Sequence, residues 1–296
     1  MRPLTPEERV RGLPFWRGIR SIKPLTGGVS NASFVVVDET GKYVARVGED
    51  YPFHHVSRAR ELAVTRAANA LGLSPPVVYD EPGIMIVGHL DAETYSETDV
   101  RADAVRCVEI LRRCHHDMPR HVIGPGAIFW VFHVLRDYAH TLKAAQHRHT
   151  PDFALWLAIA EKLEAAQLPL PIVFGHHDLL PSNFMNDGKR LWLIDWEYGA
   201  FGTAMFDLAN MASNSALGRI EEDALLDVYF GRRANEALWR SFDAMKIASA
   251  LREAMWGMVS ELYLNAPGVD YVAYAEQFLG RFEALLAGYQ ERYGKL

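Results

Sequence analysis

The segment from His176 to Glu197 combines polar side chains whose types and spacing could carry out phosphoryl transfer. It begins HHDLLPSN and continues to IDWE, with Asp195 twelve residues after Asn183. Asp178 lies in an expected loop, where its carboxylate could orient an acceptor hydroxyl and take its proton. Asn183 and Asp195 offer hard oxygen ligands that suit Mg²⁺ bridging nucleotide phosphates, and Glu197 could help to hold a second ion. Each residue alone is an ordinary turn former, but the combination indicates phosphoryl-transfer chemistry.

Two short apolar strands are expected to hold these polar groups in place. Residues 172–174 (Ile-Val-Phe) and 191–194 (Leu-Trp-Leu-Ile) flank most of the polar segment. A catalytic carboxylate and metal ligands must be fixed to well under about 1 Å, which a rigid strand on each side can provide. The sequence therefore predicts an island of β-structure around this segment.

The first 90 residues are rich in strand signals. A single helical stretch, from about residue 57 to residue 71, interrupts them and is closed by Gly72. The expected strands are residues 19–25, 33–37, 42–47, 76–79 and 84–87. This pattern predicts a small antiparallel sheet that carries one helix. Before it, Thr-Pro-Glu-Glu at residues 5–8 predicts the capped start of a short helix.

From about residue 99 the pattern changes to a helical period. Apolar residues recur three and four apart, as between Tyr271 and Leu285, which predicts helices with one face in a core. The expected helices are residues 99–116, 127–147, 152–167, 219–230, 234–263 and 270–291. A β-rich first third and a helical remainder predict an α+β fold of two lobes, residues 1–90 and 91–296.

The composition is that of an ordinary globular protein. The 296 residues include 31 Lys and Arg against 37 Asp and Glu, a formal net charge of −6. This balance argues against non-specific affinity for nucleic acid or for an anionic membrane surface. The first residues lack the apolar stretch of a signal peptide, and no apolar run is long enough to span a bilayer.

The two cysteines indicate the redox state of the cellular compartment. Cys107 and Cys114 are seven residues apart in an expected helix, which places them about 10 Å apart and too far for a disulfide. Two thiols are typical of a reducing compartment. We therefore expect a cytoplasmic protein without nucleic-acid or membrane partners.

The polar segment also resembles that of a known family. FGHHDLLPSNFM and LWLIDWEYGAFGTAMFDLAN are similar to the choline/ethanolamine kinase family within the aminoglycoside phosphotransferase superfamily. LTGGVSNASFVV, residues 25–36, resembles the nucleotide-binding hairpin of these enzymes. The resemblance implies a bilobal protein-kinase-like fold, with a small antiparallel sheet lobe and a larger, mainly helical lobe. It also implies ATP and Mg²⁺ as cofactors and transfer of the γ-phosphoryl group to a small hydroxyl acceptor.

On this resemblance the N-terminal lobe binds the nucleotide. Arg46, in the stretch YVARV, takes the place of the phosphate-clamping lysine of protein kinases, with Glu61 on the following helix as its partner. A guanidinium stays charged and can bind phosphate oxygens while it engages a carboxylate. MIVGHL, residues 85–90, matches the hinge whose backbone binds adenine. The expected nucleotide-binding residues are Gly27, Gly28, Ser30, Asn31, Arg46, Glu61, Val87 and His89.

On the same resemblance the acceptor side recognises a cation. A quaternary ammonium has no N–H to donate, so proteins bind it with aromatic faces and nearby carboxylates. AMWGMVSELY, residues 254–263, is similar to the Trp-Gly helix that lines the acceptor pocket of choline kinases. The candidate acceptor-binding residues are Tyr198, Trp256, Asp207, Glu261 and Tyr263. Two of these have an alternative role: Asp207 as a brace of the catalytic loop, and Tyr263 as a core residue.

Two positions depart from the choline kinase pattern and leave the acceptor open. Val259 stands where those enzymes typically carry a second tryptophan, and Asn214 where they tend to carry a glutamate. The expected acceptor is choline, ethanolamine or another amino alcohol, with an aminoglycoside or thiamine type as the alternative. A nucleotide-binding regulatory module without turnover is a further alternative. The sequence leaves the oligomeric state unconstrained.

Overall fold

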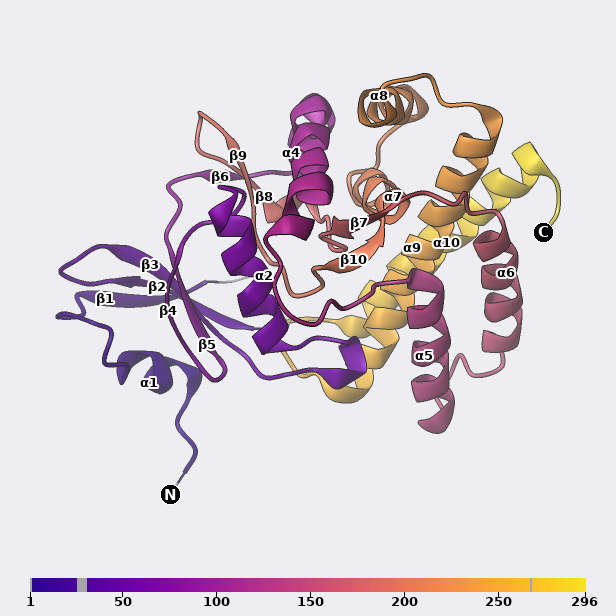
Figure 1. The fold of residues 1–296 in the computed structure, drawn as a ribbon. Helices are drawn as coiled ribbons and strands as arrows, with labels where there is room; N and C mark the ends of the chain where they lie inside the picture. Colours follow the sequence, from indigo (N-terminus) through magenta and orange to yellow (C-terminus); the bar gives the residue numbers. More distant parts are fainter. Residues whose placement is uncertain (1, 26–30, 267) are drawn as a thin grey trace.

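An antiparallel β-sheet forms the centre of the N-terminal lobe (Figure 1). The computed structural model describes residues 2–25, 31–266 and 268–296. Within these residues the sheet has five strands in the order β1-β2-β3-β5-β4, and each neighbouring pair is antiparallel, as predicted. The strands are β1 (Ser21–Leu25), β2 (Ala32–Val37), β3 (Lys42–Val47), β4 (Val77–Glu81) and β5 (Ile84–Gly88).

Two helices complete this lobe, α1 (Pro6–Arg11) and α2 (Arg58–Ala70). The Thr5 side chain accepts a hydrogen bond from the Glu8 amide, and the Glu8 carboxylate accepts one from the Thr5 amide, which is the predicted capping box. Val10 of α1 packs with Ile86 of the sheet in a small core. Val64 of α2 belongs instead to the larger core of the C-terminal lobe. In Figure 1, α2 accordingly lies between the sheet and the second lobe.

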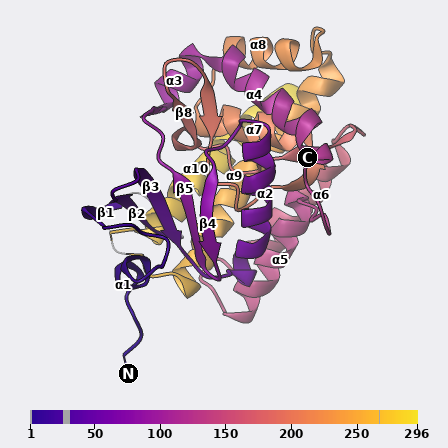
Figure 2. The same cartoon turned by 60° about the vertical axis from the view of Figure 1, so that its left-hand side comes forward.

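The C-terminal lobe is mainly helical, and α9 runs through its middle (Figures 1 and 2). Every residue of α9 from Ser241 to Ser260 is buried, because α5, α6, α7 and α10 pack around it. The helices of this lobe are α3 (Glu97–Ala102), α4 (Ala104–Asp117), α5 (Val131–Ala144), α6 (Phe153–Ala165), α7 (Ala204–Asn214), α8 (Arg219–Phe230), α9 (Glu236–Tyr263) and α10 (Tyr271–Tyr293). Cys107 and Cys114 in α4 are free, buried thiols, as their spacing predicts.

Two helices of this lobe differ from the prediction. The helix expected over residues 99–116 is divided at Asp103, where the backbone leaves the helical region (φ −118°, ψ 28°) and the carboxylate accepts a hydrogen bond from the Tyr95 hydroxyl. α7 was not predicted. All of its residues are buried, and its polar residues Asp207 and Asn210 bond to the backbone on either side of Asp178, so its pattern does not mark a solvent-exposed face.

Two small sheets carry the polar segment. The predicted strand at 172–174 is present as β7 and the one at 191–194 as β9, but they belong to different sheets. The strands concerned are β6 (Glu93–Thr94), β7 (Ile172–Gly175), β8 (Phe184–Asn186), β9 (Leu191–Leu193) and β10 (Ala200–Thr203). β7 pairs with β10, and β8 pairs with β9 and β6. Asp178 therefore follows β7, and Asp195 follows β9.

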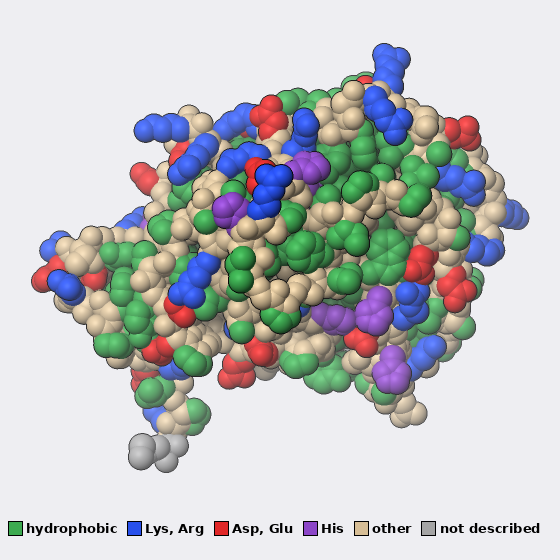
Figure 3. Space-filling view, viewed as in Figure 1, with side chains coloured by type: hydrophobic (Ala, Val, Ile, Leu, Met, Phe, Trp, Pro, Cys, Tyr) green, Lys and Arg blue, Asp and Glu red, His purple; other side chains and the backbone are tan. Residues whose placement is uncertain are grey.

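The surface mixes side chains of both charges. On the face shown in Figure 3, Lys and Arg alternate with Asp and Glu, and hydrophobic side chains lie between them. Among the described residues, no helix is both long and apolar enough to cross a membrane.

Candidate active site

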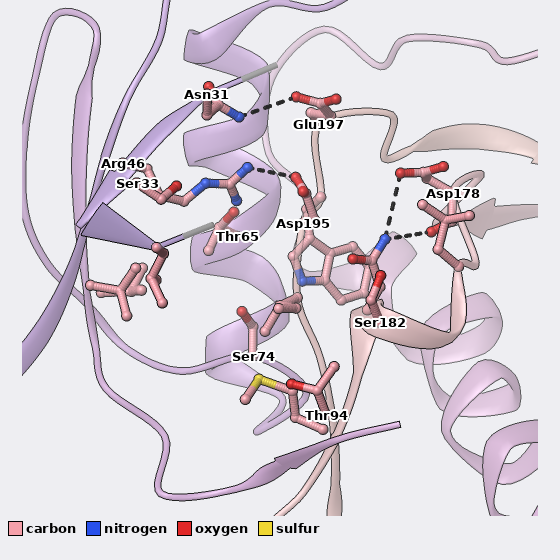
Figure 4. A pocket seen from close by; sticks show the side chains of 18 of the residues that line it. Asn31, Ser33, Arg46, Thr65, Ser74, Thr94, Asp178, Ser182, Asp195 and Glu197 are labelled. Atoms are coloured by element: carbon pink, nitrogen blue, oxygen red, sulfur yellow. Dashed lines mark hydrogen bonds and ion pairs between the residues drawn. The ribbon is translucent and has the colours of Figure 1, made fainter. Parts of the chain in front are cut away.

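A cavity of about 500 Å³ between the two lobes brings many of the predicted site residues together. Side chains of β2, β3 and β5 line one wall, and the two polar loops and α9 line the other. Asp178, Asn183 and Asp195 all border the cavity. Figure 4 shows Arg46 pointing from the sheet toward Asp195. The cavity is therefore built from both lobes, with the predicted catalytic and metal-binding groups on one side and the predicted phosphate-binding arginine on the other.

A buried aspartate on α7 holds the loop that carries Asp178. The Asp207 carboxylate oxygens accept hydrogen bonds of 2.8 Å from the backbone amides of His176 and His177. Burial alone would raise the pKa of Asp207, but His177 and His115 outweigh it and hold that pKa well below its usual range. His115 Nε2 lies 2.9 Å from Asp207 Oδ2. Asp207 is not among the residues that line the cavity, so of its two predicted roles the geometry favours the brace.

The backbone is locally unusual at two positions of the site. His177 and Asp195 have positive φ angles of 63° and 67°, a conformation that costs a non-glycine residue about 1–3 kcal/mol. Two glycines make room for the His177 ring. A Cβ at Gly175 would lie 2.5 Å from His177 Nε2, and one at Gly202 would lie 2.7 Å away. The glycines of β7 and β10 thus permit the turn that precedes Asp178.

Asp178 is positioned to act as a proton acceptor. Asn183 Nδ2 donates to the Asp178 carbonyl at 2.8 Å and lies 3.5 Å from its Oδ2 (Figure 4). Burial raises the pKa of Asp178 well above its usual value, and Arg252, with Nη1 4.0 Å from Oδ1, opposes this only in part. A raised pKa makes the carboxylate a stronger base. Since the Asn183 amide nitrogen is used on the loop, its oxygen is the atom suited to ligate a cation.

Arginines of the N-terminal lobe join the carboxylates of the site. Arg46 Nη2 lies 2.6 Å from Asp195 Oδ1, and its Nη1 lies 3.0 Å from Glu61 Oε1. Arg58 Nη1 lies 2.6 Å from Glu61 Oε2 and 2.9 Å from Glu197 Oε2. The structure thus brings Arg46 and Glu61 together, with Glu61 behind the arginine and outside the cavity lining.

This network sets the charge of the two acidic groups after β9. Burial would raise the pKa of Asp195, but Arg46 outweighs it and lowers that pKa. The pKa of Glu197 is raised to about 7 by burial and by repulsion from Asp195, against the attraction of Arg58. Asp195 is therefore ionised at neutral pH, as a cation ligand must be.

The oxygen donors of the site fit Mg²⁺ that is held jointly with a nucleotide. Within the described residues no cluster of three or more His, Cys, Asp or Glu side chains could hold a metal by itself. The predicted donors are Asn183, Asp195 and Glu197, which supply one amide and two carboxylates. Mg²⁺ in nucleotide sites usually takes one or two carboxylates together with phosphate oxygens and water. This donor set suits a metal that completes its coordination with phosphate.

The wall formed by the N-terminal lobe combines polar groups with apolar surface. The predicted nucleotide-binding residues that line it are Asn31, Arg46, Val87 and His89. Gly27, Gly28 and Ser30 lie outside the described residues. Asn31 Nδ2 also lies 3.5 Å from Glu197 Oε2 (Figure 4). Val44 and Met85 supply apolar surface between the polar groups, which suits a flat, weakly polar ring.

The wall formed by α9, α10 and Tyr198 carries aromatic and charged side chains. Trp256 Nε1 donates a hydrogen bond of 3.0 Å to the Tyr198 hydroxyl, so these two predicted residues lie together. Arg252 and Glu253 lie one turn before Trp256 on α9 and line the same wall, as does Tyr274 of α10. This wall therefore carries a buried cation and a buried anion beside the aromatic rings.

Other candidates for acceptor binding lie elsewhere. Tyr263 is half exposed and stacks on Phe53, with 4.5 Å between the ring centroids. Glu261 Oε1 accepts a hydrogen bond of 3.0 Å from Arg148 Nη2. Neither residue lines the cavity, and neither does Asn214.

The sequence analysis missed several polar residues of the site, among them Arg58, Arg252, Glu253 and Tyr274. One signal could have revealed two of them. Arg252 and Glu253 are adjacent charged residues that follow the mostly apolar residues 247–251, and charged residues in a buried helix must be paired or functional. Arg58 and Tyr274 have no comparable signal, because the contacts that place them in the site, with Glu197 and Glu253 respectively, are made between different elements.

Comparisons with known proteins agree with this geometry. Residues 21–245 match the model of the phosphotransferase enzyme family. Protein LicA of Haemophilus influenzae is 25% identical over 210 residues, 69% of this chain and 61% of that protein. A probable ethanolamine kinase of Arabidopsis thaliana is 27% identical over 209 residues, 64% of this chain and 55% of that protein. The chain thus matches little more than half of the length of these relatives.

Solved structures share the fold. A choline/ethanolamine kinase family protein from Mesorhizobium loti superposes with a TM-score of 0.75 at 25% identity, over 94% of this chain and 92% of that one. Choline kinase LicA from Streptococcus pneumoniae gives a TM-score of 0.75 at 20% identity, over 92% and 94%. These comparisons confirm the α+β bilobal, protein-kinase-like fold and the resemblance to choline/ethanolamine kinases. Because the family model covers most of the chain, the chain belongs to the phosphotransferase enzyme family.

Proposed function

We propose that this protein is an ATP-dependent small-molecule kinase, which transfers the γ-phosphoryl group of ATP to the hydroxyl of a small acceptor. The proposed acceptors are amino alcohols, with choline and ethanolamine as the first compounds to test. One observation carries the proposal: Asp178, Asn183 and Asp195 border a single cavity that Arg46 enters from the other lobe. The proposed division of labour gives nucleotide binding to residues 1–90, and catalysis and acceptor binding to residues 91–296.

Each group has a role that follows from its position. Asp178 would orient the acceptor hydroxyl and take its proton, which its raised pKa favours. Arg46 would bind phosphate oxygens while Glu61 holds its guanidinium. Asn183 and Asp195 would hold Mg²⁺, which neutralises charge on the transferred group when it is bound. Transfer then depends on positioning and charge neutralisation, without a covalent intermediate on the protein.

The test is acceptor-dependent release of ADP from Mg-ATP. The panel contains choline, ethanolamine, other hydroxyl compounds with and without an amino group, thiamine and aminoglycosides, and nucleotide binding is measured in parallel. Turnover with an amino alcohol that is lost in Asp178→Asn supports the proposal. Turnover with thiamine or an aminoglycoside alone would assign the other acceptor class. Nucleotide binding without phosphorylation of any acceptor would instead favour a regulatory module.

A further inference from the structure

A buried arginine borders the acceptor side of the cavity. The Arg252 side chain is only 1% exposed, and it lies in the stretch of α9 that is buried on all sides. Its guanidinium lies over the Tyr198 ring, with 4.5 Å between the guanidinium carbon and the ring centroid. The protein has therefore placed a permanent positive charge where the family resemblance predicts recognition of a cation.

The described residues use only part of the hydrogen-bonding capacity of this guanidinium. Arg252 Nη1 lies 2.7 Å from Glu253 Oε1 and 4.0 Å from Asp178 Oδ1. Nε and Nη2 are buried and have no hydrogen-bond partner among the described residues. A buried charged donor without a partner is costly, so such groups usually meet a ligand or a water molecule. Nε and Nη2 lie on one edge of the guanidinium plane, and this pair of donors matches the two oxygens of a carboxylate.

The groups that could receive a cation on this wall are already engaged. Glu253 Oε2 accepts a hydrogen bond of 2.9 Å from the Tyr274 hydroxyl, and Oε1 is taken by Arg252. The guanidinium covers one face of Tyr198. The Trp256 ring stacks on His54, with 4.9 Å between centroids and 20° between planes. The wall thus contains two buried hydrogen-bond donors that have no partner among the described residues, while its carboxylate is paired and its aromatic faces are in part covered.

We propose that the acceptor carries a carboxylate, which binds Nε and Nη2 of Arg252 while its hydroxyl faces Asp178. This inference rests on the proposed function, because it names the class of acceptor for the same site. The separation of 4.0 Å between Arg252 Nη1 and Asp178 Oδ1 limits the distance between the two groups of the acceptor. A compact hydroxy acid, with few bonds between the hydroxyl and the carboxylate, meets this limit. The substrate class is a small hydroxylated amino acid, that is, an amino alcohol that also carries a carboxylate.

Pairs of acceptors that differ only in the carboxylate provide the test. The pairs are serine and ethanolamine, N,N,N-trimethylserine and choline, and glycerate and ethylene glycol. We expect the wild-type protein to favour the carboxylate-bearing member by at least about tenfold in kcat/KM, because a buried donor left unpaired rejects an analogue that lacks the group. Arg252→Gln should remove this preference: loss of the charge beside Asp178 changes kcat for both members alike, and kcat/KM falls further for the carboxylate-bearing member. Arg252→Lys keeps the charge without the fork of donors and should retain part of the preference.

Two controls separate this effect from loss of folding. Lys246 lies on the same helix, is buried, and pairs with Glu222 at 2.5 Å, outside the cavity lining. Lys246→Gln should therefore lower stability without changing the preference within each pair. Thermal unfolding and nucleotide binding are measured for every variant. If Arg252→Gln does not fold, the preference of the wild-type protein within each pair and its change in Arg252→Lys still test whether Arg252 binds a carboxylate.

Three results would overturn the inference. If the wild-type protein uses the members of each pair equally, or prefers those without a carboxylate, the proposed kinase activity stands but the proposal that the acceptor carries a carboxylate is wrong. An equal fall of kcat/KM for both members in Arg252→Gln, with the preference of the wild type retained, would show that Arg252 does not bind the carboxylate. Absence of turnover with every hydroxyl compound would count against the proposed function. In that event the affinities of serine and ethanolamine for the protein with bound Mg-ADP are measured by calorimetry. The inference is overturned if serine does not bind more tightly than ethanolamine.

Discussion

Arg46 of β3 and Asp195, which follows β9, form an ion pair between the two lobes, with 2.6 Å between Nη2 and Oδ1. Arg46 also binds Glu61 of α2, so one guanidinium joins two carboxylates from different elements. The cation proposed to bind phosphate therefore contacts the carboxylate proposed to bind the metal. The ion pair thus couples the proposed phosphate-binding group to the proposed metal ligand.

Replacement of Arg46 should weaken the binding of ATP. Arg46→Gln removes the phosphate-binding charge and leaves Asp195 and Glu61 without their shared cation, so we expect KM for ATP to rise by about tenfold or more. For Arg46→Lys we expect a KM for ATP between those of the wild type and Arg46→Gln, because an ammonium keeps the charge but cannot present the same fork of donors. Steady-state kinetics with ATP varied at a saturating acceptor concentration measure the effect. Arg66→Gln, at an exposed position of α2, is the control, and an unchanged KM for ATP in Arg46→Gln would contradict the assigned role.

Removal of divalent metal should stop turnover. Chelation by EDTA is expected to abolish ADP release, and added Mg²⁺ to restore it, because the site offers one amide and two carboxylates rather than a complete metal site. Asp195→Asn should raise the Mg²⁺ concentration needed for half-maximal rate. The matched control is Asp223→Asn, at an exposed position of α8. Full activity in EDTA would exclude the metal role of these residues.

Asp178→Asn should reduce turnover while nucleotide binding survives. The amide is nearly the same size as the carboxylate but cannot take a proton, so the expected loss is about 10²–10⁴-fold in kcat. ADP release and calorimetric titration with nucleotide are measured on the same preparation. A variant that retains full kcat would show that Asp178 is not the base.

The sequence predicted the catalytic segment because its chemistry is local. Asp178 and Asn183 are five residues apart, and the short strands β7 and β9 that precede Asp178 and Asp195 are clearly apolar. The Arg46–Glu61 pair was predicted from resemblance, since a spacing of fifteen residues indicates no contact by itself.

Long-range relationships account for what the sequence analysis missed. α7 escaped prediction because it is buried all round, and the pairing of β7 with β10 depends on packing that no local pattern records. Arg252 was missed for a related reason. Its contacts with Tyr198 and Asp178 bring together residues more than 50 positions apart, which only the folded chain reveals.

Asp207→Asn should lower both stability and turnover. It removes the charge that accepts hydrogen bonds from the amides of His176 and His177, so we expect a loss of about 3 kcal/mol in the free energy of unfolding. The Asp178 loop should also be held less firmly, with a fall in kcat at temperatures where the protein remains folded. Asp243→Asn is the matched control, because Asp243 is a buried carboxylate of α9 paired with Arg219 at 3.1 Å. A variant of Asp207 that loses stability but keeps kcat would show that the brace does not position the base.

Because His54 is buried, the free energy of unfolding should fall in mild acid. Burial holds its pKa well below 6.5 in the folded state, with Arg252 as a further cause, whereas the unfolded chain regains the ordinary value. The unfolded state therefore binds more protons below about pH 6.5, so the stabilising effect is complete above that pH and is lost as the pH falls. His54→Gln should flatten the decline in unfolding free energy between pH 7 and pH 5 by up to about 1.4 kcal/mol per pH unit. Denaturant unfolding at several pH values measures this, with the exposed His140→Gln as control; identical slopes for wild type and His54→Gln would contradict it.

The burial of α9 has a consequence for how such a protein diverges. Arg252, Glu253 and Trp256 lie within five positions of one helix, whose backbone is fixed by neighbours over twenty consecutive residues. Asp178, Asp195 and Arg46, the groups proposed to carry out phosphoryl transfer, come from other elements. Under the proposed function, a few substitutions on a single helical turn would retarget a duplicated gene to a new acceptor while the chemistry is inherited unchanged.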